Sequence, residues 1–179
     1  MKTTMKTLSY YSKGIMLKKG AENFPTKYID FNELIDLMSS KDLKEKIDDL
    51  QQYKYKSFKY TYKKKTLPVV LFNKFRCNLN SGFIKENPIK PFDVDFSDNT
   101  KEEIKRFEKD IQKDCIKVIK SPSGKGLKFF KEYLFKTNDP YEYFEKYKQI
   151  CRGLEKKHNI KLDYTQGRIK QPFFLTYIK

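Results

Sequence analysis

Two aspartates, Asp93 and Asp95, alternate with apolar residues in the run Phe-Asp-Val-Asp-Phe at positions 92–96. In a strand, residues two apart share one face, so the two carboxylates would lie side by side and repel each other. A divalent cation would relieve this repulsion, because Mg²⁺ takes one or two protein carboxylates together with water and phosphate oxygens. The plainer alternative is a half-exposed strand with an acidic outer face, since this spacing occurs often by chance.

A glycine-containing basic turn follows at positions 121–128, which read Ser-Pro-Ser-Gly-Lys-Gly-Leu-Lys. It is not a Walker A loop, because the GxxxxGK[ST] pattern is absent. Its backbone amides, hydroxyls and ammonium groups are nonetheless suited to phosphate. The expected phosphate contacts are Ser121, Ser123, Gly124, Lys125, Gly126 and Lys128. The alternative is an ordinary β-hairpin turn, in which serine and glycine are common.

Lysines alternate with aromatic rings in the segment 51–65, a pattern that surfaces for single-stranded nucleic acid often show. Stacking of a base on such a ring contributes about 1–3 kcal/mol. The expected nucleic-acid contacts are Tyr53, Lys54, Tyr55, Lys56, Lys59, Tyr60, Lys63, Lys64 and Lys65. The alternative is one helix continuing from Leu43 through Phe58, with the rings packed inside and the lysines in water. Both interpretations can hold together, because Lys63, Lys64 and Lys65 would face water in either.

The charge balance favours a polyanionic partner. The 179 residues include 39 Lys plus Arg against 23 Asp plus Glu, a formal net charge of +16 at pH 7. Nucleic acid is the commonest partner of such a surface. The excess of lysine alone does not identify the partner, since an AT-rich genome produces a similar composition. The length fits one domain with a sizeable core.

Several function classes are excluded by composition. The chain has one histidine and three widely spaced cysteines, Cys77, Cys115 and Cys151, without a CxxC pair. Zinc sites and Ser/His or Cys/His triads are therefore not expected, and the thiols should be reduced in a cytoplasmic compartment. No apolar window approaches the length of a membrane span, and Lys2 and Lys6 are not followed by the apolar stretch of a secretion signal.

Three helix starts are marked by capping signals. Asp30 with Glu33 and Thr100 with Glu103 each form a capping box before an apolar periodic run. Asp139-Pro140 combines an N-cap with a proline at the first helical position. These signals predict helices that begin at residues 31, 101 and 140.

Short β-branched or aromatic runs predict strands at 67–72, 92–96, 116–120, 127–135 and 173–178. Their alternation with helices indicates an α+β domain with a mainly antiparallel sheet and flanking helices on one face. We expect a single domain over residues 1–179. Residues 1–66 would form a mostly helical, basic N-terminal section, and residues 67–179 the α+β core that carries the site.

In order, spacing and wording these segments resemble the VirE N-terminal-type domain of mobile-element replication proteins, a branch of the archaeo-eukaryotic primase superfamily. The resemblance runs from residue 30 to the end of the chain. It passes through a helix, Leu-Pro-Val-Val at 67–70, the acidic run, the glycine turn, Leu162-Asp163 and Phe-Phe-Leu-Thr-Tyr at 173–177. The glycine turn is its most specific piece. The acidic pair is specific only because it precedes that turn at the expected distance.

The resemblance implies an RRM-like primase-polymerase core. It also implies a nucleotidyltransferase of phage or plasmid type, which joins nucleotides on a single-stranded DNA template by two-metal catalysis. Asp93, Asp95 and Asp163 would then be catalytic ligands of Mg²⁺ or Mn²⁺. Without the resemblance, Leu162-Asp163 would be read as the end of a strand before a turn. The family pattern often has Ser-Arg where this chain has Lys170-Gln171, and Arg168 would supply the missing cation to the nucleotide.

Two other functions remain open from the sequence. One is a non-catalytic single-stranded nucleic-acid-binding module derived from the primase fold. The other is a metal-dependent nuclease, which is weaker because the glycine turn would have no triphosphate to hold. The expected partners of the enzyme are a single-stranded DNA template and nucleoside triphosphates. A separate replicative helicase is a further candidate, because no helicase-type section follows Lys179.

Overall fold

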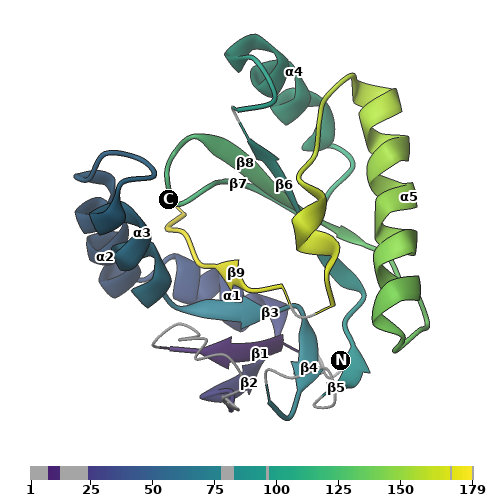
Figure 1. The fold of residues 1–179 in the computed structure, drawn as a ribbon, viewed down its shortest axis with the longest axis horizontal. Helices are drawn as coiled ribbons and strands as arrows, with labels where there is room; N and C mark the ends of the chain where they lie inside the picture. Colours follow the sequence, from purple (N-terminus) through teal and green to yellow (C-terminus); the bar gives the residue numbers. More distant parts are fainter. Residues whose placement is uncertain (1–7, 13–23, 78–82, 96, 170, 179) are drawn as a thin grey trace.

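The computed structural model describes residues 8–12, 24–77, 83–95, 97–169 and 171–178, so Phe96 and Lys170 lie outside the described residues. In chain order the elements are β1 (Leu8–Tyr11), β2 (Lys27–Ile29), α1 (Phe31–Met38), α2 (Lys41–Gln51), α3 (Phe58–Thr66), β3 (Val69–Leu71), β4 (Asn73–Phe75), β5 (Phe83–Glu86), β6 (Ile89–Asp95), α4 (Lys101–Ile111), β7 (Lys117–Lys120), β8 (Gly126–Glu132), α5 (Pro140–His158), the 3-10 helix η2 (Tyr164–Gly167) and β9 (Phe173–Phe174) (Figure 1).

The strands form three antiparallel sheets with the orders β2-β1-β3-β9, β4-β5 and β6-β8-β7. The expected α+β class with antiparallel pairing is confirmed. The strands of the described residues are divided among three sheets, however, where one had been expected. Helices α1, α2 and α3 gather beside the first sheet, whereas α4 and α5 gather beside the third (Figure 1).

The expectation of helices on one face only was wrong, because the strands are apolar on both faces. In β3, Val69 and Leu71 join one core while Val70 joins the other. In β8, Phe129 and Phe130 divide in the same way. Strands that bury both faces need cover on both sides. One core accordingly includes the inner faces of α4 and α5, and the other includes those of α1, α2 and α3.

The predicted helix starts are confirmed. The Asp30 carboxylate accepts from Glu33 N at 2.9 Å, and the Glu33 carboxylate accepts from Asp30 N at 2.9 Å. Thr100 caps α4 in the same reciprocal way, and the Asp139 carboxylate accepts from Glu142 N at 2.7 Å. Helix α5 ends at His158, and the next residue, Asn159, has a φ of 49°, the left-handed conformation that terminates many helices.

The N-terminal section contains the three helices α1–α3, and it also contains two strands that the sequence analysis did not expect. Strand β1 pairs with both β2 and β3 and is buried along its length. The Ser9 hydroxyl donates to the Asn73 carbonyl at 3.1 Å and accepts from Phe75 N at 2.8 Å. This buried hydroxyl therefore joins the first sheet to β4.

The single helix considered as an alternative for the lysine–tyrosine segment is wrong. Helix α2 ends at Gln51, and the chain turns before α3 begins at Phe58. Lys56 has a φ of 62°, which a continuous right-handed helix does not allow. The Ser57 hydroxyl then accepts from Tyr60 N at 3.2 Å and caps the new helix.

Three predicted strands are shorter than expected, because their ends turn to other partners. Strand β3 covers the centre of 67–72, and β8 stops at Glu132 before Lys136 adopts a φ of 54°. Only Phe173–Phe174 of the range 173–178 pairs as β9. After it the chain crosses to α1, where Ile178 N donates to the Met38 carbonyl at 2.9 Å.

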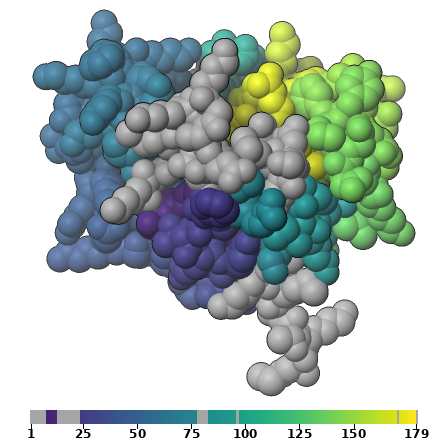
Figure 2. Space-filling model, turned by 60° about the horizontal axis from the view of Figure 1, so that its bottom comes forward, coloured from purple at the N-terminus to yellow at the C-terminus, as the bar shows by residue number. Residues whose placement is uncertain are grey.

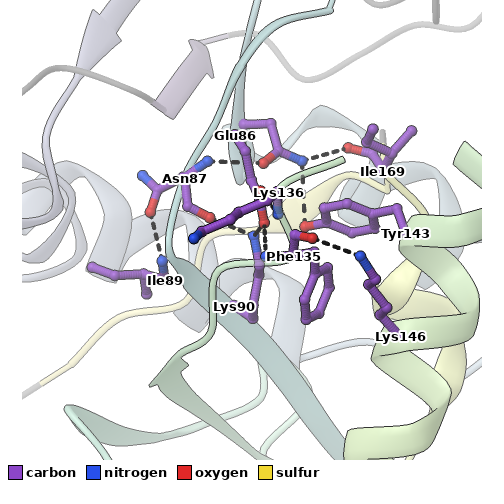
Figure 3. A network of polar contacts seen from close by, with 10 residues as sticks. Glu86, Asn87, Ile89, Lys90, Phe135, Lys136, Tyr143, Lys146 and Ile169 are labelled. Atoms are coloured by element: carbon purple, nitrogen blue, oxygen red, sulfur yellow. Dashed lines mark hydrogen bonds and ion pairs between the residues drawn. The ribbon is translucent and has the colours of Figure 1, made fainter. Parts of the chain in front are cut away.

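A buried polar cluster fixes the start of β6 (Figure 3). The Lys90 ammonium is fully buried, pairs with Glu86 at 2.6 Å, and lies 4.8 Å from the centres of both the Phe135 and the Tyr143 ring. Glu86 also accepts from the backbone N–H groups of Phe135 and Lys136 at 2.8 Å each. Burial lowers the pKa of Lys90 to about 8. The cluster ties β5, β6 and the segment before α5 together, three residues ahead of Asp93.

Candidate functional site

The three aspartates that the resemblance singled out line one pocket of about 190 Å³. The pocket lies where β6, β8, α3 and the segment from η2 to β9 meet. Its lining residues are Tyr55, Lys64, Asp93, Asp95, Ser121, Pro122, Ser123, Lys128, Asp163, Thr165, Gln166, Gln171, Pro172 and Phe174. Residues more than a hundred positions apart in the sequence, such as Tyr55 and Phe174, thus border one small space.

Core packing decides which way the acidic pair faces. Phe92 and Val94 are fully buried in the core shared with α4 and α5. Because successive side chains of a strand point to opposite faces, Asp93 and Asp95 must face the other side, toward α3. The apolar neighbours of the acidic pair therefore aim both carboxylates into the pocket.

Strand register brings the third acid and a lysine beside Asp93. Asp93 is opposite Lys128 in the pairing of β6 with β8, and on its other edge Asp163 N donates to the Asp93 carbonyl at 2.9 Å in an isolated antiparallel bridge. Directly opposed residues of antiparallel pairs share a face. Asp163, Asp93 and Lys128 therefore lie in a row on the pocket side.

The negative charge of the three aspartates is only partly compensated. Lys128 forms an ion pair with Asp93 Oδ2, whereas Asp93 Oδ1 is buried without a hydrogen-bond partner. Both carboxylate oxygens of Asp163 accept from Thr165, one from its N–H at 2.8 Å and one from its hydroxyl at 2.7 Å. Burial, followed by the charge of Asp93, raises the pKa of Asp95. Ionised Asp95 is therefore held at a free-energy cost.

Lys64 of α3 is a second cation in the pocket, although the sequence pattern predicts that it faces water. Its side chain is half-buried, and its ammonium lies 5.3 Å from the centre of the Phe174 ring. Burial and then the charge of Lys128 lower the pKa of Lys64, while the nearby aspartates act in the opposite direction. Its neighbours remain outside: Lys63 pairs with Asp49 at 2.7 Å, and Lys65 is exposed.

The glycine turn closes one side of the pocket, and each of its glycines has a physical reason. Gly124 has a φ of 68°, which glycine adopts without strain. A Cβ at Gly126 would lie 2.5 Å from the Val94 carbonyl oxygen and 3.1 Å from Asp95 Oδ1. The backbone of β8 can approach the acidic strand this closely only because residue 126 has no side chain.

Within the turn, Ser121 and Ser123 line the pocket, and their hydroxyls are hydrogen-bonded to each other at 3.0 Å. Gly124 and Lys125 are exposed outside the lining. Arg168 is also exposed and does not line the pocket, so the structure gives no contact for the nucleotide-binding role expected of it. Gln171 does line the pocket, together with Thr165 and Gln166, which the sequence analysis had not singled out.

The lysine–tyrosine segment divides into buried and exposed rings. Tyr60 is 4% exposed and belongs to the core, and Tyr53 and Tyr55 are half-buried. The most exposed rings of the segment are Phe58 at 86%, which was not among the expected contacts, and Tyr62 at 61%. Lys54, Lys56 and Lys59 are exposed. The spacing of Phe58 and Tyr62 by one helical turn after the Ser57 cap was the signal that could have identified them.

The donor set of the pocket suits a hard divalent cation, since three carboxylates supply oxygen ligands of the kind that Mg²⁺ and Mn²⁺ prefer. The partnerless Asp93 Oδ1 and the raised pKa of Asp95 fit an added positive charge at this place. Among the described residues, however, no three His, Cys, Asp or Glu side chains are grouped closely enough to hold a metal ion. The three carboxylates are thus of the right chemical type for a divalent cation, but they do not form a compact metal-binding cluster in this structure.

No protein-family model matches this chain, and no curated protein or solved structure matches it either. None of the helices in the described part of the chain is long and apolar enough to span a membrane. All three cysteines are free, and Cys77 and Cys151 are buried.

Proposed function

We propose that this chain is a nucleotidyltransferase of the primase-polymerase type, which joins nucleotides on a single-stranded DNA template. The observation that carries the proposal is the pocket itself. Asp93, Asp95 and Asp163 meet there with Lys128 and with the hydroxyls of the glycine turn. A carboxylate group beside a basic phosphate-suited turn is the arrangement that nucleotidyl transfer requires.

The order of the elements around the pocket supports the RRM-like core within this proposal. Strand β6, helix α4, strands β7 and β8 and helix α5 follow one another, and the chain then returns at Asp163 to the free edge of β6. Counting that bridge as a fourth strand gives the spatial order Asp163, β6, β8, β7. A β-α-β-β-α-β succession with the last strand beside the first is the ferredoxin-like arrangement, to which RRM sheets belong.

The side chains divide the chemistry between them. Asp93, Asp95 and Asp163 would hold Mg²⁺ or Mn²⁺. The bound ion would neutralise charge on the triphosphate and on the attacking 3′-hydroxyl. Lys64 and Lys128 offset the negative charge of the phosphates, and the Ser121 and Ser123 hydroxyls donate to phosphate oxygens. Lys125, exposed at the tip of the turn, would meet the outer phosphates.

A second candidate function, a non-catalytic single-stranded nucleic-acid-binding module, is favoured by one observation. Lys128 already pairs with Asp93 and neutralises the carboxylate that a metal ion would need. A pocket whose acids are held by internal lysines and whose surroundings are basic can bind a strand without catalysis. The two candidates predict different behaviour when the acids are neutralised.

The deciding experiment is nucleotide incorporation on single-stranded DNA, with ribo- and deoxynucleoside triphosphates and with Mg²⁺ or Mn²⁺. We expect synthesis by the wild type and none by Asp93→Asn/Asp95→Asn, because the variant loses two metal ligands. DNA binding by the variant should be retained or increased, because negative charge near the phosphates is removed. The exposed Asp36→Asn is the matched control and should synthesise normally.

Two results would count against this assignment. Continued synthesis by the double variant would show that these aspartates are not the metal ligands. An absence of synthesis from both proteins, with DNA binding retained, would favour the binding module.

A further inference from the structure

Helix α3 has two chemically distinct faces. Tyr60 and Lys64, one turn apart, point inward, one into the core and the other to the pocket. Phe58 and Tyr62, also one turn apart, lie on the opposite side and are 86% and 61% exposed. At 3.6 residues per turn the two pairs must occupy opposite faces. An exposed pair of large rings on one turn of helix needs an explanation that packing does not give.

The surroundings of these rings are positively charged. The sequence contains no Asp or Glu between Asp49 and Glu86. Lys59 and Lys65 are exposed on α3, and neither forms an ion pair with a described carboxylate. The remaining exposed positions of the helix are threonines, Thr61 and Thr66, and no aliphatic side chain accompanies the rings. Two rings among lysines suit a partner that offers flat rings and negative charge.

We propose that the outer face of α3, formed by Phe58, Lys59, Tyr62 and Lys65, binds a single-stranded nucleic acid by stacking unpaired bases on the two rings. This binding surface depends on the proposed function in one respect, since the bound strand would be the template of the polymerase. Single strands are favoured over duplexes because only an unpaired base presents a face to a ring. A protein or lipid partner would call for the aliphatic side chains that this face lacks.

On its inner side, helix α3 is linked to the pocket and to the glycine turn. Tyr55 lines the pocket, and its ring is approached by the Lys125 ammonium at 4.9 Å and the Lys56 ammonium at 5.3 Å. Tyr55 also packs edge-on against Tyr60 of α3 at 5.3 Å. Rings and ammonium groups thus connect the glycine turn to α3. In Figure 2 the blue residues of α2 and α3 lie at the opposite end of the view from the green residues of α5.

The chain has no tryptophan, so one introduced indole reports on one place. We would titrate Phe58→Trp with single-stranded oligo(dT) in EDTA, without nucleotides. Stacking should quench the indole emission, and the affinity should match that of the wild type. Tyr141→Trp, at a ring that is 74% exposed on α5, is the matched control and should not be quenched. An unquenched indole in a Phe58→Trp protein that binds the oligonucleotide would overturn the proposal.

Alanine variants test the same face by affinity. Phe58→Ala and Tyr62→Ala should each weaken oligo(dT) binding about tenfold without changing its salt dependence. Lys59→Gln/Lys65→Gln should instead lower the slope of log affinity against log salt by about 1.4. Tyr141→Ala is the control for loss of an exposed ring. Wild-type affinity in the Phe58→Ala/Tyr62→Ala variant, with an unchanged melting curve, would contradict the proposal.

Two further arms separate other partners and the enzyme. Equal quenching of the Phe58→Trp protein by duplex DNA, or a blue shift of its emission with phosphatidylserine vesicles in place of quenching by oligo(dT), would replace the proposal. Because the titrations need no catalysis, quenching without nucleotide incorporation would support this surface and count only against the polymerase. Nucleotide incorporation without quenching would support the polymerase and count against this binding surface.

Discussion

Asp95 carries the least compensated charge among the pocket residues. Its neighbour Asp93 has the ion pair with Lys128, and Asp163 is held by two hydrogen bonds from Thr165. Asp95 is instead half-buried beside another carboxylate, and its pKa is raised. A raised carboxyl pKa means that the folded protein resists ionisation of this group. A loss of stability of this kind is typical of functional sites, where a group is kept for binding a ligand and not for folding.

We therefore expect Asp95→Asn to be more stable than the wild type at pH 7, by about 2 °C in melting temperature. The sign follows from linkage. The stabilisation from protonated Asp95 is present below the ordinary aspartate pKa of 3.8 and is lost as the pH rises through the folded pKa. The advantage of the asparagine should thus be full at pH 7 and vanish near pH 3.8. Thermal melts across this range, beside the exposed control Asp36→Asn, would measure it. A destabilised Asp95→Asn would mean that the carboxylate is structural.

At the scale of the element, the glycine turn between β7 and β8 is built around two different constraints. Gly124 supplies a backbone angle, and Gly126 supplies the absence of a Cβ. Gly124 lies at the exposed tip, where a Cβ would meet only the end of the Gln51 side chain, at 3.9 Å. The second is buried against the backbone of the acidic strand. Alanine substitutions at the two glycines should therefore destabilise the protein to different extents.

Gly124→Ala should cost about 1 kcal/mol, because a left-handed backbone strains an L-residue. Gly126→Ala should cost more, since either β8 or the Val94–Asp95 backbone must move. Gly153→Ala on α5 is the control, with open space around its Cβ and a gain of up to about 1 kcal/mol in helix propensity. Urea unfolding of the three variants would rank them. Equal costs for Gly124→Ala and Gly126→Ala would contradict the assigned close approach.

The elements with strong local signals were predictable from sequence. The Asp30 and Thr100 capping boxes and Asp139-Pro140 fix helix starts through contacts between residues three apart. Such short-range signals can be read directly from the sequence. Strand β1 could not be found in this way. Both of its faces are buried, with Leu8 and Tyr10 in one core and Tyr11 in the other, so its residues Leu-Ser-Tyr-Tyr do not alternate in polarity. That burial is decided by partners far along the chain, such as β3, which pairs with one edge of β1.

The candidate site likewise contains residues that were predictable from local sequence and residues that were not. Asp93 and Asp95 were predictable as a pair, because the apolar residues between and around them fix their common face. The inward turn of Lys64 was not, since it depends on where α3 begins. That start is set by the left-handed Lys56 and the Ser57 cap, and a local break of this kind reverses which lysines face water.

For the whole molecule, the dominant electrostatic fact is a formal net charge of +16 at pH 7. Several of the described ion pairs are exposed pairs along a single helix, such as Lys44 with Asp48 and Lys46 with Asp42. Exposed pairs of this kind contribute little to stability. The self-repulsion of the surface is therefore opposed mainly by the two apolar cores.

We expect the melting temperature to rise by a few degrees as NaCl is increased from about 10 mM to about 150 mM, because screening weakens this repulsion. Choline chloride at equal ionic strength is the control, since it separates screening from binding of a particular ion. Differential scanning calorimetry would measure the shift. A melting temperature that falls with salt would show that attractive surface pairs outweigh the repulsion.

The antiparallel bridge between Asp163 and Asp93 makes the candidate site divisible. Everything up to the left-handed Asn159 contains two of the acids and the glycine turn, whereas Asp163, Gln171 and β9 come from the short remainder. A break in the chain at Asn159 would give a large fragment and a peptide that reassembles on the free edges of β6 and β3. The pocket could then be completed by adding that peptide, which would make this fold a two-piece switch controlled by peptide concentration.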